Sequence, residues 1–112
     1  MPHITLEDRV LTNLVPGIDL RTFWGENMML SVADLEPGAV LPPHSHPHEQ
    51  GGVILEGELM LTIGGDTKVL QPGDIYIAEG GVEHSGQAGP EGCRALDIFS
   101  PVREEYKFEA QS

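Results

Sequence analysis

Basic residues are scarce in this sequence. Six lysines and arginines stand against eighteen aspartates and glutamates, and the formal net charge at pH 7 is −12. Binding to nucleic acid or to an anionic membrane requires clustered positive side chains that neutralise phosphates. The composition therefore argues against both classes of partner, and it makes any arginine near a pocket conspicuous. The candidates are Arg9, Arg21, Arg94 and Arg103.

Cysteines and long apolar segments are also missing. Cys93 is the single cysteine, so no intrachain disulfide can form, which agrees with a reducing compartment. No segment approaches the roughly 18–20 apolar residues of a membrane-spanning helix. The N-terminus lacks the basic and apolar regions of a signal peptide. We therefore expect a cytoplasmic protein.

No segment shows sustained helical periodicity either. Fourteen glycines and nine prolines interrupt short apolar segments instead, a pattern typical of an all-β sandwich or barrel. The expected strands are 28–35, 52–56, 58–63, 67–70, 75–78 and 94–99. We expect a tight bend at Gly57 and a loop over residues 85–92. The length fits one domain, residues 1–112, with N-terminal strands over 1–27, a barrel core over 28–99 and a tail over 100–112.

Histidines are concentrated in the segment PHSHPHEQGG, residues 43–52. His44 and His46 are two residues apart, so on an extended backbone their side chains point the same way. Imidazole suits divalent first-row metals. The distant His84 can close such a site, and alternation from His46 places Gln50 on the same face. The segment therefore predicts a metal site, against the plainer alternative of a hydrogen-bonded polar cluster.

Two neighbours of this set leave alternatives open. His48 continues the alternation, but Pro47 interrupts the strand, so a solvated or supporting role is favoured. Glu49 replaces Gln50 as a ligand if the register slips by one residue. Four further side chains are assigned to structure or to no role: His3 in the terminus, Cys93 as a small buried side chain, and Trp24 and Met60 in the core or an interface.

The spacing around the histidines resembles the two motifs of the cupin family. The first runs Gly38, five residues, His44-Ser-His46, three residues, Gln50, six residues, Gly57; the second runs Gly73, five residues, Glu79-Gly80-Gly81, two residues, His84. The family usually has Glu where this chain has Gln50, Pro where it has Glu79 and Asn where it has Ala88. The resemblance implies a double-stranded β-helix, the cupin jelly-roll barrel, with a metal in the barrel mouth.

The same resemblance implies a ligand set. His44, His46, Gln50 and His84 would hold one divalent ion (Ni, Mn, Fe, Co or Zn). The neutral amide of Gln50 leaves the ion its full positive charge, which favours Lewis-acid chemistry on an anion. It also removes the carboxylate that non-haem iron oxygenases use, which makes oxygen chemistry less favoured.

A second informative segment is DIFSPVR, residues 97–103. Asp97 and Phe99 share one face of a strand, and Arg103 follows Pro101. By themselves these residues are as consistent with solvated charges and a core phenylalanine as with a site. Combined with the histidine segment, they resemble small single-domain cupins of the KdgF type, which linearise unsaturated uronates in pectin and alginate breakdown.

That resemblance implies an isomerase-type enzyme acting on a small anionic sugar. Asp97 would be the general acid and base, Arg103 would bind the substrate carboxylate, and Phe99 would supply an apolar wall. Small cupins often dimerise through sheet edges, so we also expect a homodimer through residues 1–30. The competing interpretations are an iron-dependent dioxygenase or polyketide-cyclase-like cupin, and a non-catalytic sugar- or metal-binding module.

Overall fold

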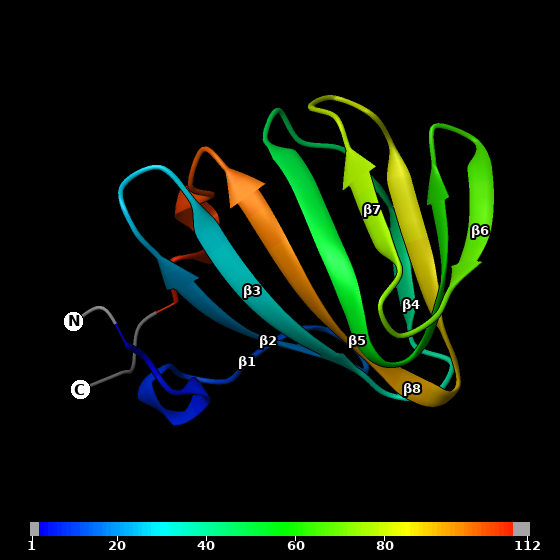
Figure 1. The fold of residues 1–112 in the computed structure, drawn as a ribbon, viewed down its shortest axis with the longest axis horizontal. Helices are drawn as coiled ribbons and strands as arrows, with labels where there is room; N and C mark the ends of the chain where they lie inside the picture. Colours follow the sequence, from blue (N-terminus) through cyan, green and yellow to red (C-terminus); the bar gives the residue numbers. More distant parts are fainter. Residues whose placement is uncertain (1–2, 109–112) are drawn as a thin grey trace.

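Short strands separated by glycine and proline turns form one antiparallel β structure that curls over itself (Figure 1). This computed structural model describes residues 3–108. The strands are β1 (Thr12–Val15), β2 (Ile18–Trp24), β3 (Met29–Leu35), β4 (Val40–His44), β5 (Glu49–Ile63), β6 (Asp66–Leu70), β7 (Ile75–Ala78) and β8 (His84–Ser100). Two 3-10 turns, η1 (Leu6–Asp8) and η2 (Glu104–Tyr106), flank them. The all-β prediction is confirmed. Within residues 3–108, no helix is long and apolar enough to cross a membrane.

The strand order is β1-β2-β3-β8-β5-β6, with β4 paired to β8 and β7 paired to β5. The two longest strands, β5 and β8, pair along their whole length and join the two halves of the structure. The first half of β5 also pairs with β7, and its second half pairs with β6. Strand β1 is at one edge, so the homodimer contact expected through residues 1–30 stays a prediction.

The sequence-based bend at Gly57 and the loop over residues 85–92 were both wrong. Each lies inside a continuous strand, β5 or β8, and the pairing shifts register near Gly57 instead of ending there. Gly57 and Gly92 adopt positive φ angles of 73° and 82°, and a Cβ on Gly57 would collide with the Gly92 carbonyl. Glycines that resemble turn signals in the sequence therefore serve as kinks where two paired strands approach closely.

Alternate residues of β3 face a buried core between the two halves: Met29, Ser31, Ala33 and Leu35. Cys93 is free and buried, as predicted. Met60 does not belong to the core, because its side chain is 42% exposed on the outer face. Trp24 is half-buried under the guanidinium of Arg9, which lies 4.7 Å from its ring centre.

Candidate metal centre

Three histidine side chains from separate segments meet at one end of this core. His44 ends β4 and pairs in register with His84, the first residue of β8, while His46 lies in the connection to β5. One ring nitrogen from each histidine lies within 4.8 Å of the others. His46 and His84 are buried, with 9% and 3% exposure. The predicted convergence of these three imidazoles is therefore present.

Hydrogen bonds to the backbone determine which ring nitrogen of each neutral imidazole carries the proton. In all three histidines Nδ1 lies 2.9–3.0 Å from a main-chain carbonyl two residues away. Because a carbonyl only accepts, Nδ1 carries the proton and Nε2 of the neutral ring has a free lone pair. The acceptors are the carbonyls of Pro42, His48 and Val82. Metal-binding histidines are held in this way.

The electrostatic surroundings keep the two buried rings neutral. Burial lowers the pKa of His46, and the positive charge of Arg103 lowers it further. Burial likewise lowers the pKa of His84. Within residues 3–108, the Nε2 atom of His84 is buried without a hydrogen-bond partner. A buried lone pair with no donor opposite it is the environment that a metal ion satisfies.

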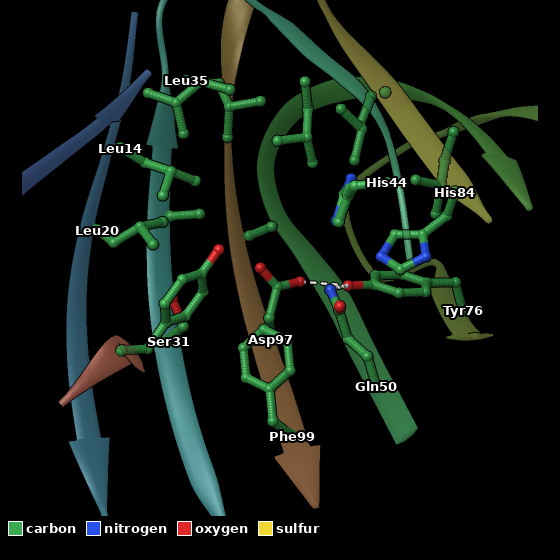
Figure 2. A pocket seen from close by; sticks show the side chains of 18 of the residues that line it. Leu14, Leu20, Ser31, Leu35, His44, Gln50, Tyr76, His84, Asp97 and Phe99 are labelled. Atoms are coloured by element: carbon green, nitrogen blue, oxygen red, sulfur yellow. Dashed lines mark hydrogen bonds between the residues drawn. The ribbon is translucent and has the colours of Figure 1, made fainter. Parts of the chain in front are cut away.

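Gln50, near the start of β5, completes the donor set. Its Oε1 atom lies 3.0 Å from Nε2 of His46. Its Nε2 atom donates to the Tyr76 hydroxyl at 2.6 Å (Figure 2). The amide oxygen and the neutral His46 nitrogen are both acceptors, so they repel unless a proton or cation lies between them. Three imidazole nitrogens and this oxygen therefore fit a divalent first-row metal.

A row of four residues crosses the sheet beside this centre. The register aligns Ser31 of β3 with Asp97 of β8, Gly52 of β5 and Tyr76 of β7. Gly52 has no side chain, and the Tyr76 hydroxyl donates a hydrogen bond across it to Oδ1 of Asp97. A Cβ at Gly52 would lie 2.5 Å from the Tyr76 ring and 2.8 Å from the Asp97 oxygen. The contact therefore depends on a glycine at this position.

The two ends of that hydrogen bond have altered acidities. Burial raises the pKa of Asp97 to about 6, although hydrogen bonds from Tyr76 and Gln50 oppose the shift. Burial and the Asp97 charge raise the pKa of Tyr76 well above its ordinary value. Tyr76 therefore stays protonated near neutral pH, whereas Asp97 can gain or lose a proton there.

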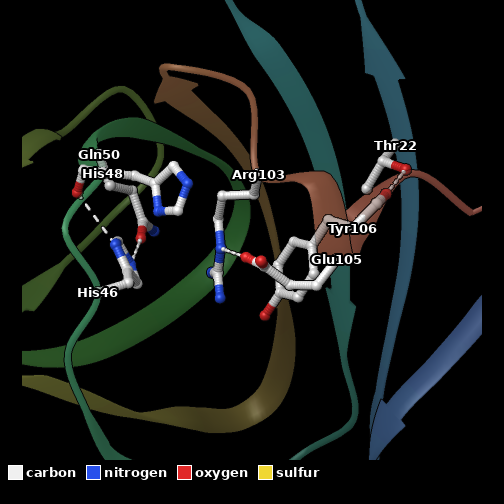
Figure 3. A network of polar contacts seen from close by, with 7 residues as sticks. All are labelled: Thr22, His46, His48, Gln50, Arg103, Glu105 and Tyr106. Atoms are coloured by element: carbon white, nitrogen blue, oxygen red, sulfur yellow. Dashed lines mark hydrogen bonds and ion pairs between the residues drawn. The ribbon is translucent and has the colours of Figure 1, made fainter.

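The C-terminal segment folds back over the open side of the site (Figure 3). The guanidinium of Arg103 lies 3.8 Å from the ring centre of Tyr106 and 5.1 Å from that of Phe99. Its Nε–H donates to Glu105 at 2.8 Å. The Thr22 hydroxyl donates to the Tyr106 carbonyl at 2.6 Å and ties this segment to β2. The guanidinium is thus held against two aromatic rings at the cavity wall.

These elements enclose a cavity of about 70 Å³. Its polar and charged lining includes His44, Gln50, Tyr76, His84, Asp97 and Arg103. Much of the apolar lining is leucine, including Leu14, Leu20, Leu35, Leu59 and Leu61. Ser31 also lines it, with a fully buried hydroxyl that has no partner within the described part of the chain.

Every side chain in the predicted site lies in or next to this cavity. Asp97, Phe99 and Arg103 line it together with His44, Gln50 and His84, and His46 adjoins it through Gln50. Their chemical roles stay predictions. Glu49 is exposed on the opposite face of β5, so the alternative ligand register is not adopted. His48 supports His46 through its backbone carbonyl.

Sequence reasoning missed three hydroxyl-bearing residues of the cavity, Ser31, Tyr76 and Tyr106. Alternation in the segment IYIA, residues 75–78, marks Tyr76 as inward-facing. No local pattern shows that Tyr76 meets Asp97, because that contact requires β5 to lie between β7 and β8.

Residues 31–99 match the family model described as the cupin domain. The chain belongs to the cupin domain family. Over 84 residues this cupin is 30% identical to the pectin degradation protein KdgF of Dickeya dadantii (strain 3937), covering 74% of this chain and 76% of that protein. It is 34% identical over 89 residues to the dimethylsulfoniopropionate lyase DddW of Ruegeria pomeroyi, covering 77% of this chain and 59% of the lyase.

Among solved structures, KdgF from Halomonas sp. superimposes on this cupin with a TM-score of 0.82 at 27% identity, covering 88% of this chain and 92% of that one. The resemblance to KdgF-type cupins and the cupin fold predicted from the motifs are therefore confirmed. Its relatives support an enzymatic role, and the three-histidine cluster is compatible with one metal ion.

Proposed function

We propose that this cupin is a metal-dependent enzyme that converts 4,5-unsaturated uronate monosaccharides into the linear 5-keto-4-deoxyuronate. The observation that carries the proposal is that Asp97, Arg103 and the histidine cluster border one cavity. Similarity to a pectin degradation protein supports the same substrate class. Catalysis of this isomerisation needs an anion-binding group, a proton-transfer group and an electrophile, and the cavity has a candidate for each.

The reaction rearranges bonds without gaining or losing atoms. The C1 hydroxyl of the pyranose loses its proton, the C1–O5 bond breaks, and C1 becomes an aldehyde. The electrons released at O5 form the C5 ketone as the C4=C5 double bond takes up a proton at C4. One proton leaves oxygen and one arrives at carbon, so a group that titrates near neutral pH suits both transfers.

Asp97 is the group that we assign to proton transfer, because its pKa of about 6 lies near neutral pH and its side chain faces the cavity. Arg103 offers a planar pair of N–H groups to the substrate carboxylate. A divalent ion held by the three histidines and Gln50 would supply Lewis-acid stabilisation of negative charge on oxygen. Phe99 and Tyr106 support the guanidinium and limit access of water.

A second candidate is elimination on a short acyclic carboxylate. It is favoured by the volume and lining of the cavity, since about 70 Å³ bordered by leucines is smaller than the roughly 150 Å³ cavity that holds benzene in another protein. A uronate ring must therefore keep part of its surface at the mouth, whereas a short aliphatic acid fits more fully. The lyase relative acts, by its name, on dimethylsulfoniopropionate.

The deciding experiment offers both substrates to the metal-loaded protein. The monouronate is generated by a lyase, and loss of the ultraviolet absorbance of its C4=C5 bond is followed for wild type, Asp97→Ala and His46→Ala. We expect rapid loss with wild type and only spontaneous decay with either variant. Equal decay in all three would refute the uronate proposal. Dimethyl sulfide release from dimethylsulfoniopropionate would favour elimination, and oxygen uptake with iron would favour a dioxygenase.

A further inference from the structure

We infer that Tyr76 and Asp97 orient the Gln50 amide, so that its oxygen rather than its nitrogen faces the histidines. The inference rests on the metal centre of the proposed function and assigns Tyr76 a positioning role in it. These three side chains form one hydrogen-bonded chain (Figure 2), and the free amide oxygen of Gln50 lies 3.0 Å from Nε2 of His46 (Figure 3).

The direction of each hydrogen bond follows from the number of protons available. The hydroxyl of Tyr76 has a single proton, which it donates to Oδ1 of Asp97. The Tyr76 oxygen can then only accept, and its neighbour 2.6 Å away must be a donor. The amide nitrogen of Gln50 is the donor that meets this condition. The amide oxygen is therefore left on the other side, 3.0 Å from Nε2 of His46.

An amide needs this control because its two ends are almost equal in shape. Rotation by half a turn would replace the oxygen with an NH₂ group, which has no lone pair for a cation. A carboxylate has two equivalent oxygens and needs no such control. Gln50 stands where the cupin motif usually has glutamate, so Tyr76 supplies a control that the usual carboxylate does not need.

Burial gives the hydrogen-bonded chain its strength. Gln50 and Tyr76 are only 7% and 8% exposed, so water competes weakly for these groups. The absence of a side chain at Gly52 lets the Tyr76 hydroxyl reach Asp97. The register of β7, β5 and β8 sets the relative positions of Tyr76, Gln50 and Asp97. The nitrogen end of the amide is thus held by residues on paired β-strands.

The test is a double-mutant cycle read out by metal affinity. Co²⁺ binding is measured through its visible absorption for wild type, Tyr76→Phe, Gln50→Glu and the double variant, at a pH where carboxylates are ionised. We expect Tyr76→Phe to weaken Co²⁺ binding roughly ten- to hundredfold when Gln50 is present. In the Gln50→Glu background, Tyr76→Phe should alter the Co²⁺ affinity by less than about threefold, because either oxygen of a carboxylate can bind the ion.

Thr62→Val is the control, since Thr62 lies on the same strand as Gln50 but its hydroxyl bonds Thr67 outside the cavity. It should bind Co²⁺ as wild type does. Equal losses from Tyr76→Phe in both backgrounds would reveal a general structural effect and overturn the inference. No loss in either background would overturn it as well. Circular dichroism and thermal unfolding of each variant confirm that folding is retained.

Asp97→Asn separates this inference from the proposed reaction. The carbonyl of asparagine can still accept from Tyr76, so Co²⁺ affinity should stay within a few fold of wild type. Turnover should fall sharply if Asp97 also transfers the proton. A protein with no uronate activity but the expected affinity pattern would refute the proposed substrate and keep the orienting role. Full activity of Tyr76→Phe with unchanged affinity would refute the orienting role alone.

Discussion

The Tyr76 hydroxyl donates a hydrogen bond to the Asp97 carboxylate although a whole β-strand lies between the two residues. The bond passes over Gly52, the one position of that row without a side chain. The glycine in the middle strand thus has a packing role that joins strand pairing to the chemistry of the cavity.

Substituting Gly52 tests this relationship. We expect Gly52→Ala to lower the free energy of unfolding by about 1–3 kcal/mol, because the new Cβ overpacks the Tyr76 ring and the Asp97 carboxylate. Gly51→Ala is the control, since a Cβ there meets its nearest atom at an ordinary 3.5 Å. Its unfolding free energy, measured in denaturant, should stay within about 1 kcal/mol of wild type. Equal losses at both positions would contradict the packing role of Gly52.

The metal ligands can be separated from their neighbours with two alanine variants. His84→Ala removes a buried nitrogen of the cluster, so we expect metal binding to fall at least about a hundredfold. His48→Ala leaves the backbone carbonyl that supports His46, so binding should change by less than about threefold. Calorimetric titration with Ni²⁺ or Co²⁺ measures both. Tight binding by His84→Ala would exclude it from the ligand set.

The raised pKa of Asp97 predicts a pH dependence of stability in the metal-free protein. The unfolded chain releases this proton near the ordinary value of 3.8, whereas the folded protein holds it to about 6. Between these values the folded state binds more protons, so the Asp97 contribution to stability falls as pH rises from about 4 to about 6. The full effect approaches about 3 kcal/mol.

The measurement compares wild type with Asp97→Asn in denaturant at a series of pH values. The difference isolates Asp97 from His46 and His84, whose lowered pKa values make stability rise with pH. We expect wild type to lose stability relative to the variant as pH rises from about 4 to about 6, with no further change above about 6. A difference that does not vary with pH would show that Asp97 ionises as easily in the folded protein as in the unfolded chain.

Ser31 and Thr22 are opposite each other on neighbouring strands, and both are buried. Removing their hydroxyls should change the free energy of unfolding in opposite directions. Ser31 has no hydrogen-bond partner within residues 3–108, whereas Thr22 donates to the Tyr106 carbonyl at 2.6 Å. Ser31→Ala should therefore raise the free energy of unfolding by about 1 kcal/mol. Thr22→Val should lower it by a similar amount, because a buried carbonyl loses its donor. Destabilisation by Ser31→Ala in denaturant would indicate that the hydroxyl has a structural partner.

Arg103 should act mainly in substrate binding. Removing its charged hydrogen bonds with Arg103→Ala should raise KM for the uronate roughly ten- to hundredfold with a smaller change in kcat. Arg103→Lys should recover only part of the loss, because lysine lacks the planar fork that lies on the aromatic rings. Arg94→Ala is the control, since Arg94 pairs with Asp34 away from the cavity. Unchanged kinetics of Arg103→Ala would remove Arg103 from the site.

Much of the site was predictable because its signals are local. Spacing marked His44 and His46, the resemblance to the second cupin motif added His84, and alternation distinguished buried Gln50 from exposed Glu49. The same rule put Asp97 and Phe99 on one face, and the resemblance to KdgF-type cupins implied that this face looks into the cavity. These predictions rest on side-chain direction along a single strand, which depends on backbone geometry and not on distant partners.

The continuous course of β5 and β8 was not predictable in this way. Gly57 and the segment 85–92 have the composition of turns, and only pairing of one strand with the other keeps them extended. The fold-back of Tyr106 over Arg103 likewise depends on a hydrogen bond to Thr22, more than eighty residues earlier in the chain. Strand pairing overrides the turn propensity of such segments, because many backbone hydrogen bonds form together.

The sequence by itself therefore determined the strand-rich fold, the kinds of ligand and their spacing, because these follow from local periodicity and side-chain chemistry. Tertiary structure alone decided which residues surround those ligands. The orientation of the Gln50 amide depends on Tyr76 and Asp97, which come from two strands paired on either side of its own. The register between paired strands brings such groups together, and this register cannot be inferred from any single segment of the sequence.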